Sequence, residues 1–174
     1  MENHIKILWN PWRFEYVKDS IKQKGACILC ELPKKGDEES YILYRGKHAY
    51  IVLNAYPYNT GHLMIVPYKH IGNLEELGRE ELVEIMDLTV KSIKVLKKSY
   101  NPDGFNIGVN IGRAAGAGIA DHVHVHIVPR WVGDTSFIVI FSATKNLPQS
   151  LDETYKLLKD TWKEIFSDEE ALDH

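Results

Sequence analysis

Three histidines alternate with aliphatic residues in the segment from His122 to Val128. Because successive side chains of a β-strand point to opposite faces, His122, His124 and His126 are expected on one face, about 6.5–7 Å apart. Near neutral pH an imidazole can act as a nucleophile, a proton carrier or a metal ligand. Three imidazoles on one face add nothing to packing that leucine would not supply better. The segment therefore predicts an active-site strand rather than a polar edge strand.

Both cysteines of the chain lie in one motif, Cys27-Ile28-Leu29-Cys30. Such a pair is either redox-active or half of a metal site. A redox pair is expected at the strand-to-helix turn of a βαβ unit, whereas here a charged segment from Glu31 to Glu39 follows. The pair therefore favours zinc, which needs two further ligands that histidines can supply.

The strands that must position these residues are predicted from alternating and apolar runs bounded by turn residues. Four strands are predicted before the histidine strand, at Tyr41–Arg45, Ala49–Leu53, His62–Pro67 and Phe105–Asn110. The first two are expected to form a hairpin at Gly46-Lys47. The charged segment Pro33–Glu39 is expected to be a solvated loop.

Two helices are predicted from apolar residues at helical spacing. The longer helix covers Arg79–Tyr100, with one apolar stripe made of Leu82, Ile85, Met86, Val90, Ile93 and Leu96. The closing helix covers Glu153–Phe166, and its inward side is Leu157, Leu158, Trp162 and Phe166.

These elements predict an α+β fold, with a mainly antiparallel sheet of about five strands, a long central helix and a C-terminal helix. The 174 residues are expected to form one domain. It would comprise an N-terminal arm (1–26) with a short helix around Arg13–Lys22, a main part (27–145) and a C-terminal helix (146–174) packed on that part. The glycine-rich segment Gly112–Gly118 leads into a strand rather than a helix, which argues against a dinucleotide-binding fingerprint.

The net charge of −3 provides no global positive field to attract a nucleic acid polymer, so an anionic ligand must be held by local donors. The N-terminal residues lack the apolar run of a signal peptide, and no apolar segment is long enough to cross a membrane. A cytoplasmic protein with neither a membrane partner nor an organic cofactor is therefore expected.

The chain resembles the histidine triad superfamily of nucleotide hydrolases and transferases over roughly residues 27–131. The residues that carry the resemblance are the alternating histidines, Asn54 eight residues before His62, Gly61–Pro67 and Asn110-Ile111-Gly112. Three further segments resemble the microbial branch that contains diadenosine tetraphosphate phosphorylases: Trp9–Arg13, Gly116–Ile119 and Pro129–Asp134. The resemblance implies an enzyme that cleaves a nucleotide or dinucleoside polyphosphate, and a homodimer.

The resemblance assigns the covalent nucleophile to the middle histidine of the triad, His124. A neutral imidazole can attack an α-phosphate and form a nucleotidyl-histidine, which divides one difficult displacement into two easier ones. The flanking His122 and His126 could orient the nucleophile or bind phosphate, and the resemblance places His126 on the leaving-group side. It also implies that His62 completes the cluster, although a histidine there could simply form a hydrogen bond after a turn.

The resemblance also implies substrate contacts. It assigns Asn54 to the ribose hydroxyls, although an asparagine there could instead cap a turn. Candidates for holding the α-phosphate are Asn110 and the backbone of Gly116, Ala117 and Gly118. Distal phosphates could be neutralised by Arg113 and Arg130, unless these are ordinary surface arginines.

One departure from the family bears on the group that accepts the nucleotidyl moiety. Hydrolase branches usually carry a glutamine followed by serine or threonine where Ala117 and Gly118 stand here. A small, glycine-lined loop leaves room for inorganic phosphate, and Arg113 could stabilise its charge. Phosphate is therefore favoured over water as the acceptor, and water stays open as the alternative.

In zinc-bearing relatives two histidines complete the metal site, and the matching positions here are His70 and His122. With Cys27 and Cys30 they give four protein ligands, which leave no open coordination position, so the metal would be structural. The remaining histidines are interpreted as surface or packing residues: His4, His48 and His174.

Three alternatives remain on the residues alone. The triad histidines could instead bind a catalytic metal, as in a metal-dependent hydrolase. The protein could be a hydrolase of dinucleoside polyphosphates or nucleoside phosphoramidates. It could also be a nucleotide-binding partner protein without catalytic activity.

Overall fold

The computed structural model describes residues 26–135 and 147–170. The predicted N-terminal helix, His4 and His174 lie outside these residues. Within them, no helix is long and apolar enough to cross a membrane.

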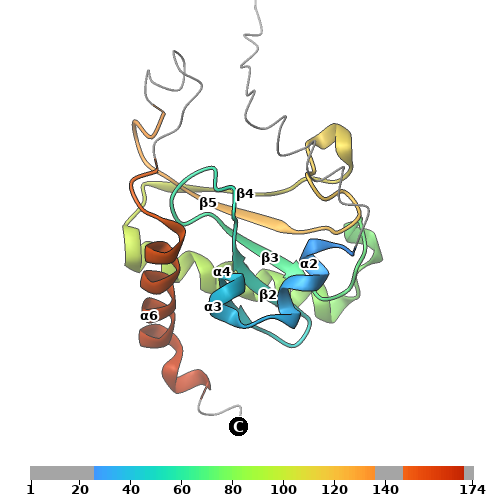
Figure 1. Ribbon diagram of the computed structural model, residues 1–174, viewed down its shortest axis with the longest axis horizontal. Helices are drawn as coiled ribbons and strands as arrows, with labels where there is room; N and C mark the ends of the chain where they lie inside the picture. Colours follow the sequence, from blue (N-terminus) through green and yellow to red (C-terminus); the bar gives the residue numbers. More distant parts are fainter. Residues whose placement is uncertain (1–25, 136–146, 171–174) are drawn as a thin grey trace, which may run out of the picture.

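Five antiparallel strands form one sheet in the order β1-β2-β3-β5-β4 (Figure 1). The strands are β1 (Ile42–Arg45), β2 (Ala49–Leu53), β3 (Leu63–Pro67), β4 (Gly104–Val109) and β5 (Val125–Arg130). The predicted α+β class and the β1–β2 hairpin are confirmed. The hairpin turn is held by Glu84, whose carboxylate accepts hydrogen bonds from the backbone N–H groups of Lys47 and His48.

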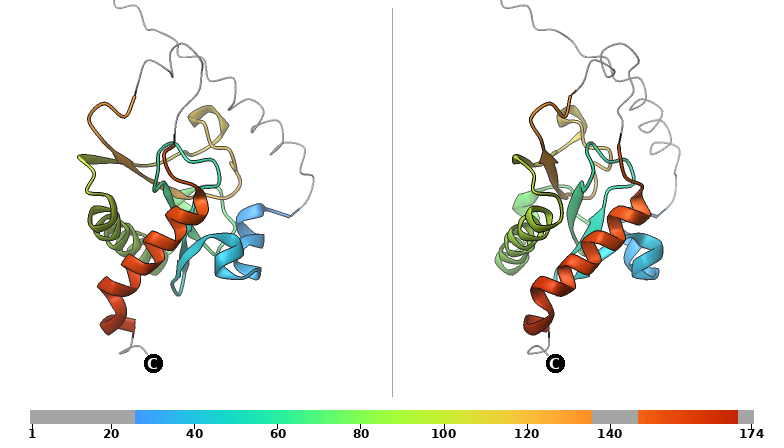
Figure 2. Two further views of the ribbon diagram at one scale, coloured as in Figure 1. Left: turned by 60° about the vertical axis from the view of Figure 1, so that its left-hand side comes forward. Right: turned by 90° about the vertical axis from the view of Figure 1, so that its left-hand side faces the viewer.

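Helices α4 (Arg79–Tyr100) and α6 (Leu151–Glu170) pack against one face of the sheet, while α2 (Ile28–Glu31) lies on the other side (Figure 2). The α4 bounds agree with the prediction. Side chains of the sheet and of both helices are buried together in one core, among them Ile51, Ile65, Ile127, Leu96, Leu158 and Trp162.

The predicted apolar stripe of α4 is confirmed only in part. Ile85 and Leu96 are buried as expected, whereas Leu82, Met86 and Val90 are 42%, 61% and 46% exposed. The other buried residues of the helix are Leu88, Thr89, Ser92 and Val95. At 100° per residue the exposed apolar residues form a second stripe beside the buried one. The sheet covers only the stripe that includes two small polar residues. Thr89 is accommodated there because its hydroxyl donates to the carbonyl of Ile85.

The charged segment Pro33–Glu39 is largely exposed, as expected, but it is not a loop. It forms a 3₁₀ turn, η1 (Leu32–Lys34), and a short helix, α3 (Asp37–Ser40). Arg45 satisfies backbone carbonyls of this segment, because its guanidinium donates to Pro33 and Lys35 while it pairs with Asp37. Side-chain hydrogen bonds of this kind replace the water that a loop would need.

The histidine strand also differs from the prediction. β5 begins at Val125, so His122 and His124 lie in an irregular segment before it, and only His126 belongs to the ladder, opposite Met64 and Gly108. The backbone N–H of Val123 donates to the carbonyl of Ile71, in the loop after β3, rather than to a neighbouring strand. The predicted alternation nevertheless holds for the aliphatic residues, because Val123, Val125 and Ile127 are buried in the same core.

Candidate active site and metal centre

His124 is a buried imidazole whose protonation is fixed by the backbone. Its Nδ1 lies 2.9 Å from the carbonyl oxygen of His122. Because a carbonyl oxygen only accepts, Nδ1 carries the proton and Nε2 is left with its lone pair. Burial lowers the pKa of His124, although the hydrogen bond to the His122 carbonyl opposes this shift. A neutral ring with an unprotonated Nε2 is the form that a nucleophile requires.

His62 and His126 form a pair of rings next to the His124 ring. The backbone N–H of Tyr58 donates to Nδ1 of His62 at 3.0 Å, and Nε2 of His62 lies 3.0 Å from Nδ1 of His126. Since Nδ1 of a neutral His62 accepts, its proton is on Nε2 and is donated to His126. A neutral His126 then carries its own proton on Nε2. The ring centroids of His124 and His126 are 4.7 Å apart, edge to face.

The predicted site residue Asn54 lies beside His62. Its amide nitrogen is 3.4 Å from Nδ1 of His62, and its side-chain oxygen accepts from the backbone N–H of Tyr56. The turn-capping role considered for Asn54 is thus present in the structure. Because the amide nitrogen faces the same Nδ1 as the N–H of Tyr58, Asn54 also favours the proton on Nε2 of His62.

The other predicted phosphate-binding residues lie in the connection from β4 to β5. Asn110 follows β4, and Arg113 is an exposed residue that begins the 3₁₀ turn η3 (Arg113–Ala115). Gly116 has a φ of 90°, which favours glycine, and its N–H donates to the carbonyl of Arg113. The N–H of Ala117 donates to Gly112. These bonds shape a tight turn before His122 and use two of the amide groups that were predicted to hold phosphate.

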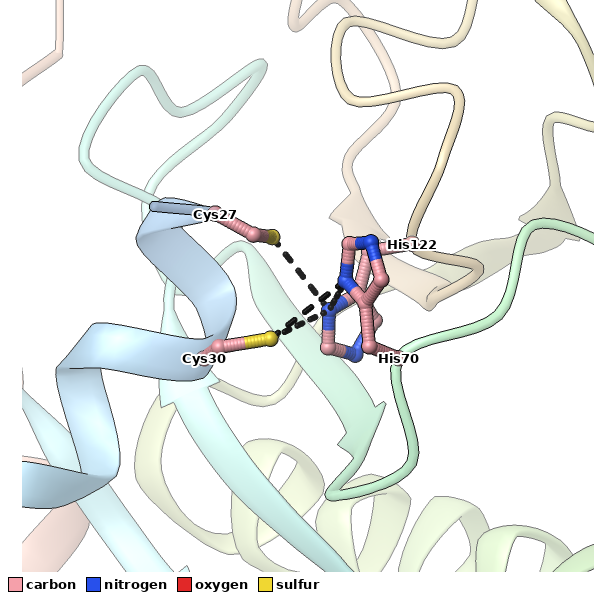
Figure 3. A group of neighbouring side chains, drawn as sticks. All are labelled: Cys27, Cys30, His70 and His122. Carbon is pink, nitrogen blue, oxygen red and sulfur yellow. Dashed lines mark hydrogen bonds between the residues drawn. The ribbon is translucent and has the colours of Figure 1, made fainter. Parts of the chain in front are cut away.

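The structure brings the four predicted metal ligands together (Figure 3). Cys27 immediately precedes α2 and Cys30 lies within it, while His70 comes from the loop after β3 and His122 from the segment before β5. One ligand atom of each lies within 4.8 Å of the others. Nδ1 of His122 is 3.4 Å from each of the two sulfurs and 3.3 Å from Nδ1 of His70. These separations fit four ligands around one tetrahedral ion.

The chemistry of the donor set also fits zinc. Nε2 of His122 lies 2.9 Å from the carbonyl oxygen of Pro67, so Nε2 carries the proton and Nδ1 is unprotonated toward the sulfurs. Both cysteines are free thiols. The hydroxyl of buried Tyr50 donates to the carbonyl of Leu29, which attaches α2 to the sheet between the two cysteines.

The structure does not support a metal held by the three triad histidines. Within the described ranges, the only group with metal-binding geometry contains His122 and neither His124 nor His126. His48 pairs with Glu80 at 3.4 Å, as expected of a surface histidine.

Several residues near the site escaped the sequence prediction. Tyr58 contacts His62 through its backbone N–H, so its residue type gives no indication of this contact. Asn59 and Asp134 are joined by a hydrogen bond, and Asp134 also pairs with Arg130. The signal for Asp134 was present, because it closes the Pro129–Asp134 segment that resembles a known branch.

Comparison with known proteins adds independent evidence. The HIT domain family profile matches residues 35–132. A protein of Mycobacterium tuberculosis named AP-4-A phosphorylase is 42% identical over 167 residues, which cover 92% of this chain and 86% of the relative. An uncharacterised HIT-like protein of Methanocaldococcus jannaschii is 38% identical over 133 residues, covering 76% of this chain and 98% of the relative. The crystal structure of a zinc-bound histidine triad family protein from Mycobacterium smegmatis superposes with a TM-score of 0.66 at 21% identity, covering 86% and 99% of the two chains.

Proposed function

The chain belongs to the histidine triad (HIT) family, and we propose that it cleaves dinucleoside polyphosphates by transferring a nucleotidyl group to His124. The similarity to an AP-4-A phosphorylase over most of both chains makes it an enzyme of the nucleotidyltransferase or nucleotide hydrolase class. The observation that carries the proposal is the buried His124 ring, with its proton held on Nδ1 and its lone pair on Nε2.

In the proposed first step, Nε2 of His124 attacks the α-phosphorus of diadenosine tetraphosphate. A nitrogen–phosphorus bond forms, the bond from phosphorus to the bridging oxygen breaks, and ATP leaves. The positive charge that develops on the His124 ring is stabilised through its Nδ1–H bond to the His122 carbonyl. His126 supplies a hydrogen bond or a proton from Nε2 to the leaving oxygen, and His62 keeps that proton on Nε2.

In the proposed second step, an oxygen of inorganic phosphate attacks the nucleotidyl group, the bond to His124 breaks, and ADP leaves. Support for phosphate comes from the small residues Ala117 and Gly118, which take up little space in the turn before the triad, and from the exposed cation of Arg113. We assign the ribose to Asn54 and the α-phosphate to Asn110 with the backbone of Gly118, because the N–H groups of Gly116 and Ala117 donate within the turn. If water takes the place of phosphate, the product is AMP.

We further propose that Cys27, Cys30, His70 and His122 hold one structural zinc ion. The ligand separations and the unprotonated Nδ1 of His122 support this, and so does the zinc-bound fold neighbour. When bound, the ion would join α2 to the segment that carries the nucleophile. No reaction step passes through it.

A homodimer is the third part of the proposal. The outer stripe of α4 leaves Leu82, Val83, Met86 and Val90 exposed, and Ile107 of β4 is 47% exposed at the edge of the sheet. Exposed apolar stripes and open strand edges are the features that a second copy of a chain can cover.

The experiment that tests the reaction is product analysis with isotopically labelled inorganic phosphate. Diadenosine tetraphosphate should give ATP and labelled ADP, and the rate should depend on phosphate concentration. If turnover is independent of phosphate and gives AMP with ATP, the enzyme is a hydrolase. If no turnover occurs but nucleotides bind, the non-catalytic alternative is correct.

A further inference from the structure

The carboxylate of Asp134, in the turn after β5, is the centre of a hydrogen-bond network. Its Oδ2 accepts from Nε of Arg130 at 2.6 Å, from the side-chain amide of Asn59 at 2.8 Å and from the backbone N–H of Trp131 at 3.3 Å. Its Oδ1 accepts from a second nitrogen of Arg130 at 2.8 Å. The side chain of Asp134 is only 8% exposed. The donation from Arg130 is the main cause that holds the pKa of Asp134 far below its usual range, so the carboxylate is charged at neutral pH.

Asn59 connects this network to the loop between β2 and β3, which passes beside the end of β5 (Figure 1). The amide nitrogen of Asn59 donates both to Asp134 and to the carbonyl of Pro129, which uses its two hydrogens. The carbonyl of Asn59 accepts from the backbone N–H of His62. Asn59 is thereby held through both its side chain and its backbone carbonyl, and this also fixes the position of the preceding residue, Tyr58.

Tyr58 makes the shorter of the two contacts that keep the proton off Nδ1 of His62, because its backbone N–H donates to Nδ1 at 3.0 Å while the Asn54 amide lies at 3.4 Å. We propose that Asp134 is a positioning residue that acts through Asn59 and Tyr58 to keep the proton of His62 on Nε2, directed at His126. The inference deepens the proposed function, on which its catalytic consequence depends. Asp134 contacts neither the rings nor the reacting atoms in this scheme.

The two neutral tautomers of imidazole differ little in energy. Neighbouring hydrogen-bond donors and acceptors therefore determine which tautomer is populated. If the N–H of Tyr58 moves away, only the longer contact from the Asn54 amide, at 3.4 Å, still opposes a proton on Nδ1 of His62. A share of the molecules then carries the proton on Nδ1, and Nε2 becomes an acceptor in them. His126 must then donate from Nδ1, and its Nε2 loses the proton that the leaving group needs. The result is an enzyme that binds substrate normally and turns it over slowly.

Two variants break the network at different points. Asp134→Asn keeps the size of the side chain but removes its charge. Whichever way the amide is turned, its nitrogen faces a donor of Arg130, so the two hydrogen bonds from Arg130 cannot both be kept. Asn59→Ser leaves the Arg130–Asp134 pair intact and removes only the bonds to Asp134 and Pro129. Asp37→Asn is the matched control, because it breaks an Asp–Arg pair of the same 2.6 Å length, with Arg45, on the side of β1.

The measurement is the ¹⁵N spectrum of the histidine rings in the labelled full-length protein, together with kcat and KM. In the wild type, Nδ1 of His62 should show the shift of an unprotonated nitrogen. Asp134→Asn and Asn59→Ser should shift this signal toward a mixture of tautomers and lower kcat about tenfold, with KM changed less than about twofold. Asp37→Asn should change neither quantity.

The proposal is overturned if both folded variants keep the wild-type signal of His62, whatever their activity. It is equally overturned if kcat falls as much in Asp37→Asn as in the other two. If Asp134→Asn does not fold, Asn59→Ser decides the question by the same criteria. Failure of the proposed function has a different signature, since an enzyme inactive on dinucleoside polyphosphates still shows whether the His62 tautomer follows Asp134.

Discussion

The candidate metal centre and the candidate active site each contain a histidine from the segment before β5, His122 and His124. The two rings carry their protons on different nitrogens. His122 donates from Nε2 to Pro67, which leaves Nδ1, the nitrogen nearer the backbone, to face the cysteines. His124 donates from Nδ1 to the carbonyl of His122, which leaves Nε2 at the tip of the ring. The proposed zinc ligand and the proposed nucleophile thus differ in which ring nitrogen carries the proton that is donated to a backbone carbonyl.

The clusters are also physically joined. The carbonyl that holds the proton of His124 belongs to His122, whose ring lies among the metal ligands. A change in the metal centre should therefore reach the nucleophile through one residue, whereas loss of the nucleophile should leave the metal centre intact. Variants of each cluster test this asymmetry.

The largest effect is expected from His124→Ala. Removing the nucleophile deletes the covalent pathway, so turnover of diadenosine tetraphosphate should fall by roughly a thousandfold or more, while ribose and phosphate contacts keep nucleotide affinity nearly unchanged. Steady-state rates and calorimetric titration with a nucleotide measure the two quantities, and His48→Ala is the control. Activity within about tenfold of the wild type would refute the nucleophile assignment.

His126→Ala should be less damaging, with kcat about a hundredfold lower, because it removes a proton donor and not the covalent path. The loss should shrink on an adenylyl substrate whose leaving group is weakly basic, such as a nitrophenyl ester, since such a group needs no proton. Comparing kcat on the two substrates tests specifically whether His126 donates a proton to the leaving group. An equal loss on both would mean that His126 does not assist the leaving group.

Zinc-cluster variants should affect stability first and catalysis second. Purified protein should contain about one zinc per chain. Cys27→Ser should lower both the zinc content and the melting temperature, by roughly 5 °C or more, while some activity remains. Atomic emission and thermal unfolding give these values, with His48→Ala again as a control for surface histidines. Native zinc-free protein that melts with the metal-loaded form, or a Cys27–Cys30 disulfide, would contradict the structural metal site.

The smallest effect on either cluster is expected from Met86→Asp. This substitution places a charge on the outer stripe of α4 and should convert the proposed dimer to a monomer, as measured by light scattering. Zinc content should not change, because Met86 lies on the exposed side of the helix. A variant that stays dimeric at micromolar concentration would show that this stripe is not the interface.

The sequence predicted the bounds of the helices and strands better than which side of each is buried. Regular spacing and turn residues predicted the bounds of β2 and α4 as observed. The buried side of α4 was predicted only in part, because apolar residues occupy two adjacent stripes and packing against the sheet determines which one is covered. The histidine strand was predicted too long, since the backbone of Val123 bonds to Ile71 and regular pairing begins only at Val125.

Within the candidate site, the sequence identified most of the side chains but could not predict their protonation. The resemblance pointed to His70 and His62, and the structure places each of them in the expected cluster. Which nitrogen carries a proton depends on the carbonyl of Pro67 and the N–H of Tyr58, backbone groups that every sequence contains. Asp134 acts at a distance, through a contact with Asn59 that no local pattern encodes.

The most direct test of the central claim is to trap the covalent intermediate. Enzyme mixed with diadenosine tetraphosphate in the absence of phosphate is quenched in alkaline denaturant within milliseconds, where a phosphorus–nitrogen bond survives, and its peptides are analysed by mass spectrometry. We predict one adenylyl group on His124, absent in His124→Ala and lost when phosphate is added before the quench, with ADP formed in its place. An active enzyme with no adduct, or with the adenylyl group on another residue, would contradict the account.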